Sequence, residues 1–73
     1  MGKLRRLSGK EVIHILEKHG FQKVRQRGSH IVMQKQLPQT TITGPVPDHD
    51  EIKKGTLFGI IRQSKLPREE FEI

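Results

Sequence analysis

At 73 residues and a formal net charge of +6, the chain is predicted to be one small basic domain. It has no Trp, Tyr or Cys, which excludes disulfides and thiolate zinc sites and leaves a compact aliphatic core. The excess of Lys and Arg predicts a polyanionic partner, either a nucleic acid or an acidic protein. No apolar run approaches the ~20 residues of a membrane-spanning helix, and no secretory signal is visible. We therefore expect a protein that does not bind membranes, and a small domain without disulfides fits a reducing cytoplasm.

The first predicted element is a helix from Ser8 to about His19. The segment Ser8-Gly9-Lys10-Glu11 matches a capping box, in which the Ser and Glu side chains satisfy free amides of the first turn. Apolar residues then recur at helical spacing, at Val12, Ile15 and Leu16. Gly20 suits the left-handed residue that ends a helix, and Phe21 can pack back against it. Residues 1–7 are expected to form a basic arm before this helix.

A β-hairpin centred on Gly28-Ser29 is predicted next. Polar and apolar residues alternate over 23–27 and again over 30–34, as in strands with one buried face. Gly28 suits the first central position of a type II′ turn, which needs a positive φ. Gly28-Ser29 is therefore expected to be a two-residue loop.

This loop predicts the register of the two strands. It places Arg27 opposite His30, Arg25 opposite Val32 and Lys23 opposite Gln34. Because directly opposed residues share a sheet face, the three cations are expected in a row beside His30. Alternate residues of a strand lie about 6.6–7 Å apart, comparable with successive phosphates of a nucleic-acid strand. A solvated hairpin surface without function explains the same pattern, so both interpretations stay open at this point.

The rest of the chain completes an α-β-β-β-α order. Residues Thr40–Thr43 predict a third strand, and the glycine and prolines of 44–48 predict irregular structure. A second helix is expected from about Gly55-Thr56, and a short helix over 67–73. The predicted fold class is α+β, with two helices on one face of a three-stranded antiparallel sheet and the other face open to solvent.

Further basic residues and the histidines are candidate ligands for a phosphate or a metal ion. Lys35 is expected to extend the basic patch. Lys53-Lys54 lies just before the second helix, whose N-terminal amides suit a phosphate. His14 and His19 lack the spacing of a helical zinc pair. Asp48-His49-Asp50 offers three potential metal ligands but is better explained as a solvated acidic turn. No metal and no cofactor are therefore expected.

Four segments in this order resemble the HicA-type mRNA interferase toxins, the ribonucleases of HicA–HicB toxin–antitoxin pairs. They are residues 16–21, 25–30, 46–57 and 60–71, and the resemblance runs from about residue 8 to 73. It implies a double-stranded-RNA-binding-domain-like fold, cleavage of mRNA, and silencing by a HicB-like antitoxin that covers the face bearing His30. It also implies that His30, which follows Gly28 and Ser29, is the functional histidine.

Residue patterns and resemblance together predict a metal-independent endoribonuclease that acts on mRNA. His30 is the predicted catalytic base, because imidazole has an ordinary pKa of about 6.5 and both protonation states are accessible near neutrality. The predicted RNA-binding residues are Lys23, Arg25, Arg27, Gly28, Ser29, Lys35, Lys53 and Lys54. Two alternatives remain: a non-catalytic double-stranded-RNA-binding module, and an adaptor whose basic face docks an acidic protein.

Overall fold

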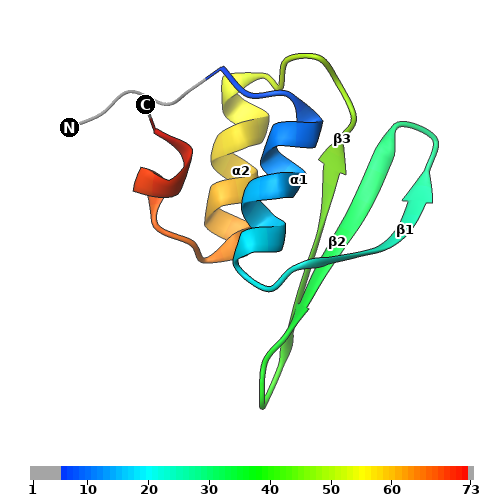
Figure 1. The fold of residues 1–73 in the computed structure, drawn as a ribbon, viewed down its shortest axis with the longest axis vertical. Coiled ribbons are helices and arrows are strands. Elements are labelled where there is room, and N and C mark those ends of the chain that lie inside the picture. Colours follow the sequence, from blue (N-terminus) through cyan, green and yellow to red (C-terminus); the bar gives the residue numbers. More distant parts are fainter. Residues whose placement is uncertain (1–5, 73) are drawn as a thin grey trace.

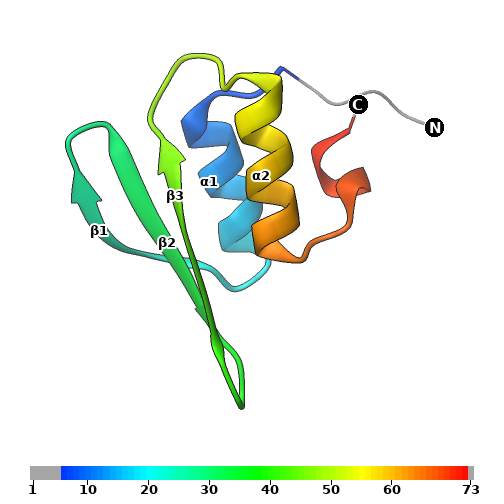
Figure 2. The same ribbon diagram turned by 180° about the vertical axis from the view of Figure 1, so that it is seen from behind.

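The computed structural model describes residues 6–72, which form two helices, three strands and one 3-10 turn (Figure 1). They are α1 (Gly9–Lys18), β1 (Gln22–Arg27), β2 (His30–Gln36), β3 (Thr41–Pro47), α2 (Lys54–Ser64) and the 3-10 turn η1 (Arg68–Phe71). The strands make an antiparallel sheet in the order β1-β2-β3. Both helices lie on the same side of this sheet, and Figure 2 shows the same two layers from behind. The predicted α-β-β-β-α fold, resembling a double-stranded-RNA-binding domain, is confirmed.

The core lies between the two helices and the sheet face that they cover. Its buried apolar residues are Leu7, Val12, Leu16, Phe21, Ile31, Met33, Ile42, Val46, Ile52, Leu57, Ile60 and Phe71. Phe71 brings η1 into this core, which ties the end of the chain to the helices. Strand β1 contributes no buried residue and stands away from both helices (Figure 1). The hairpin β1–β2 is therefore open to solvent along β1.

The ends of α1 follow the predicted signals. The Ser8 hydroxyl accepts the Glu11 N–H at 3.1 Å, and the Glu11 carboxylate accepts the Ser8 N–H at 2.9 Å, which completes the capping box. At the other end Gly20 has a φ of +92°, and the Phe21 N–H donates to the Leu16 carbonyl at 3.0 Å. This is the bond of a Schellman ending, and the buried Phe21 ring then joins the core.

Strand β3 is longer than predicted. Residues 44–48 were expected to be irregular, yet β3 runs from Thr41 to Pro47 and pairs with β2 throughout. The prediction was wrong because β3 is an edge strand, where a proline is tolerated if its nitrogen faces away from the neighbouring strand. Pro45 and Pro47 occupy alternate positions of this edge. The next amide, that of Asp48, points inward and donates to the Ser29 carbonyl at 2.6 Å.

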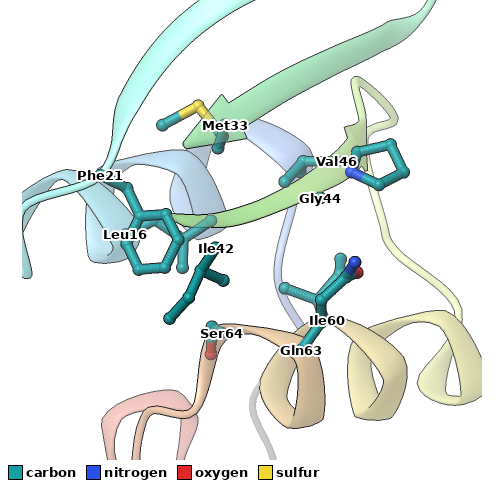
Figure 3. Close-up of a pocket in the computed structure, with 10 residues that line it drawn as sticks. Leu16, Phe21, Met33, Ile42, Gly44, Val46, Ile60, Gln63 and Ser64 are labelled. Carbon is teal, nitrogen blue, oxygen red and sulfur yellow. The ribbon is translucent and has the colours of Figure 1, made fainter. Parts of the chain in front are cut away.

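A small cavity of about 20 Å³ lies between α2 and the sheet (Figure 3). Core side chains form most of its wall, and Gln63 and Ser64 are the polar side chains beside it. The Gln63 amide donates to the Thr43 carbonyl at 2.8 Å, and the Ser64 hydroxyl donates to the Ile61 carbonyl at 2.9 Å. The space suffices for about one water molecule. It is a packing gap of the core and too small for a substrate.

Candidate active site

The hairpin that carries His30 has the predicted turn. Strand β1 ends at Arg27 and β2 begins at His30, so Gly28-Ser29 is a two-residue loop. Gly28 has a φ of +56°. Lys65 is the one non-glycine residue of the described chain with a positive φ, so the φ of Ser29 is negative. A positive φ at the first loop residue alone is typical of a type II′ turn and excludes type I′, which needs it at both.

His30 lies in the middle of one end of the sheet. Two rows of paired residues cross the three strands here: Arg27–His30–Pro47, and beside it Arg25–Val32–Pro45. Because paired residues share a face, both arginines and His30 lie together on the face that the helices leave open. The side chains of Arg25, Arg27 and His30 are all exposed. An imidazole and two guanidinium groups can therefore meet one large polyanion.

Lys23 does not belong to this row, and its predicted pairing with Gln34 was wrong. A β-bulge just after Lys23 adds one residue to β1, so Lys23 pairs with Met33. A shift of one residue moves a side chain to the other face of a sheet. The Lys23 ammonium donates to the Gln26 amide oxygen at 3.1 Å, and the Gln26 amide donates to the Gly28 carbonyl at 3.1 Å. This chain of hydrogen bonds braces the turn from the opposite face.

Lys35 also lies on the face that carries the helices, so its predicted place in the open-face patch was wrong. It pairs with the core residue Ile42, and its ammonium lies 5.9 Å from the centre of the Phe21 ring. Along a strand, residues an odd number of positions apart point to opposite faces. Lys35 is five positions from His30, which places the two side chains on different faces.

The start of α2 lies at the same end of the molecule as the hairpin turn (Figures 1 and 2). Lys53 precedes the helix and Lys54 is its first residue, and both are exposed. The first turn contains no acidic residue, and the Lys53 side chain makes no capping hydrogen bond. Free helix amides beside two ammonium groups favour an anion. Phosphate binding by these two lysines remains a prediction.

The loop between β3 and α2 is held against the start of α1. The Gly9 N–H donates to the His49 carbonyl at 2.9 Å, and the Ile52 N–H donates to the Leu7 carbonyl at 2.8 Å. The backbones are so close that a Cβ at Gly9 would overlap the Pro47 carbonyl oxygen. Gly9 thus positions the end of β3, which pairs with His30. Its importance was missed because a glycine inside a capping box has no distinctive sequence signal.

The other three histidines lie away from the open face or outside the strands. His14 is exposed on α1, and His49 is exposed in the loop after β3. His19 ends α1, and its Nε2 lies 2.7 Å from a carboxylate oxygen of Glu70 in η1. Within residues 6–72, no group of three His, Asp or Glu side chains is placed to hold a metal ion. Among the described helices, none is long and apolar enough to cross a membrane.

The chain was compared with known protein families and matches the HicA toxin family. The family described as "HicA toxin of bacterial toxin-antitoxin" matches residues 9–66, which include both helices and all three strands of the sheet. No match is found among curated proteins. Because the family covers most of the chain, the predicted resemblance is confirmed: the chain belongs to the HicA toxins of bacterial toxin–antitoxin systems.

Proposed function

We propose that the chain is an endoribonuclease that cleaves mRNA with His30 and is inhibited by a HicB-like antitoxin. The observation that carries this proposal is the pairing of Arg27 with His30 at the exposed end of the open sheet face. It combines a group suited to proton transfer with a fixed cation. The net charge of +6 and membership of a toxin family both support a polyanionic cellular target.

In the proposed reaction His30 removes the proton of a ribose 2′-hydroxyl. The 2′-oxygen attacks the adjacent phosphorus, and the bond from phosphorus to the 5′-oxygen breaks. The products are a 2′,3′-cyclic phosphate and a 5′-hydroxyl, whose proton comes from water. A general base of this kind contributes about 10²–10⁴-fold to the rate.

The arginines stabilise charge in this reaction. Arg27 is directly opposite His30, which brings their Cβ atoms to about 4.5–5.5 Å. Its guanidinium neutralises the charge that develops on the phosphate oxygens during attack. Arg25, one row further along, holds the neighbouring phosphate. The exposed Gly28-Ser29 turn contacts the same nucleotide, and Lys53-Lys54 holds a more distant phosphate.

The antitoxin is proposed to act by covering this surface. Its acidic groups are drawn to the basic domain by long-range attraction, which raises the association rate. Tight binding then comes from apolar contacts and buried hydrogen bonds around the site, because exposed ion pairs contribute little. RNA and antitoxin would compete for the same face.

The test is cleavage of a single-stranded mRNA by purified wild-type, His30→Ala and His14→Ala proteins in EDTA. His30→Ala should lose about 10²–10⁴-fold in rate while its circular dichroism stays unchanged, because an exposed side chain contributes little packing. His14→Ala, which removes an exposed imidazole from α1, should cut normally, and His49→Ala should have at most a mild effect. A folded His30→Ala protein that cuts at the wild-type rate refutes the proposal.

One observation favours a second candidate, a non-catalytic RNA-binding module. Among the paired positions of the open face, His30 is the one titratable group besides the arginines, so no side chain there serves as a general acid. The same incubation separates the candidates. RNA that stays intact although the protein binds it would support the binding module.

A further inference from the structure

Beyond the two arginine rows, the open face changes its chemistry. The next paired residues are Gln34 on β2 with Thr43 on β3 and with Gln22 on β1. The residues that follow on the same face are Gln36 and Thr41. All are uncharged, and each can donate and accept hydrogen bonds. The apolar pair of Val32 and Pro45 lies between these polar residues and His30.

We propose that Gln34 and Thr43, with Gln22 beside them, bind the base of an unpaired RNA nucleotide two positions from the cleaved phosphate. This set of three residues is called the amide row below. It would give the toxin a sequence preference that the arginines cannot provide, because phosphates carry no base identity. The inference rests on the RNA-binding part of the proposed function.

The spacing of the rows supports this placement. Successive rows on one face are about 6.6–7 Å apart, so Gln34 lies about 13 Å along β2 from His30. Successive phosphates of a single strand have a comparable separation. An RNA strand with its reactive phosphate at His30 therefore places the next nucleotide over Val32 and Pro45, and the following one at the amide row.

The chemistry of the amide row suits a base better than a phosphate. No Lys or Arg pairs into it, so nothing there neutralises an anion. A glutamine amide presents one donor and one acceptor side by side, the pattern that recognises adenine through two hydrogen bonds. Gln34 is partly buried, and its amide donates to the Thr43 hydroxyl at 3.2 Å. That bond orders the side chain before RNA arrives, which lowers the entropy lost on binding.

Two measurements test whether the amide row binds a base. In the first, cleavage sites are mapped on a long unstructured RNA for the wild type, Gln34→Leu and Thr43→Val. The wild type should favour adenine two nucleotides from the cut by at least about fivefold, the lower end for a two-bond base contact. Both variants should flatten this preference. Gln39→Leu, which removes an exposed glutamine from the β2–β3 turn, is the matched control and should retain it.

In the second, binding to oligo(A), oligo(U) and oligo(C) is compared in the His30→Ala background with and without Gln34→Leu. Oligo(A) should bind most tightly, and Gln34→Leu should remove that advantage. Cleavage without a base preference, or with a preference that survives both variants, overturns the proposal that the amide row binds a base. The proposed ribonuclease activity would still stand. If the wild type cuts no RNA, the proposed function fails, and the binding ratios alone decide: a ratio unaffected by Gln34→Leu overturns the inference.

Discussion

Removing one positive charge from the open face should change the salt dependence of RNA binding, whereas removing one from the helix face should not. Arg27→Ala and Lys35→Ala each remove one charge from the same domain. Arg27 lies on the open face opposite His30, and Lys35 lies on the other face above the Phe21 ring. If the charge of the whole molecule governed binding, the two variants would behave alike. If a specific site on the open face governs binding, only Arg27→Ala should change the salt dependence.

The magnitude follows from the number of phosphates that the protein neutralises. Four cations remain as candidate phosphate contacts: Arg25, Arg27, Lys53 and Lys54. For single strands the slope of log K against log salt is about −0.7 per neutralised phosphate, so four contacts predict about a 50-fold loss of affinity from about 50 to 200 mM salt. Arg27→Ala leaves three contacts, so its affinity for RNA should fall only about 20-fold over the same salt range. Lys35→Ala should keep the wild-type value.

The assay is fluorescence anisotropy with a labelled single-stranded RNA, in the His30→Ala background so that the RNA stays intact. Circular dichroism of each variant controls for folding, which matters for Lys35 because of its contact with Phe21. Equal slopes for Arg27→Ala and Lys35→Ala would refute the assignment of RNA to the open face. A Lys35→Ala slope shallower than that of Arg27→Ala would place RNA on the helix side.

Other predictions concern stability and regulation. Gly9→Ala should lower stability by about 1–3 kcal/mol in thermal or urea unfolding, because the new Cβ meets the Pro47 carbonyl. Gly59→Ala should instead raise it by about 0.5–1 kcal/mol, because nothing lies within 4 Å of a Cβ on this helical glycine. Lys65→Gly should raise the Tm slightly, since Lys65 has a φ of +61° and a side chain is disfavoured there; a lower Tm would contradict this. In a competition titration with His30→Ala protein, RNA and antitoxin should exclude each other, and simultaneous binding without mutual loss of affinity would rule out masking.

Several features could be predicted from the sequence because they depend on residues a few positions apart. The capping box of Ser8 and Glu11, the Gly20 ending of α1 and the Gly28-Ser29 turn each involve bonds within about six residues. The Gly28-Ser29 turn also determines that Arg27 pairs with His30, since a two-residue loop allows only one register for the two residues that flank it. The central pair of the candidate active site therefore followed from local chemistry.

Strand alternation also indicates the sheet face on which Lys35 lies. Lys35 is an odd number of positions from His30, and the intervening strand is regular, so its place on the helix face was readable. The two prolines of β3 led to the wrong prediction of irregular structure over residues 44–48. Pro45 and Pro47 break hydrogen bonds only in a central strand, and whether a strand lies at an edge depends on the whole sheet.

Only the tertiary structure decided which groups meet across longer distances. The bulge after Lys23 depends on how β1 fits β2, and it moved one cation of the predicted row to the other face. The close approach of Gly9 to Pro47 depends on how α1 crosses the end of β3. Sequence alone thus determined the elements, the turn and the residue types of the site. Packing between β1 and β2 determined that Lys23 does not stand in the row beside His30, because contacts between separate segments leave no local pattern in the chain.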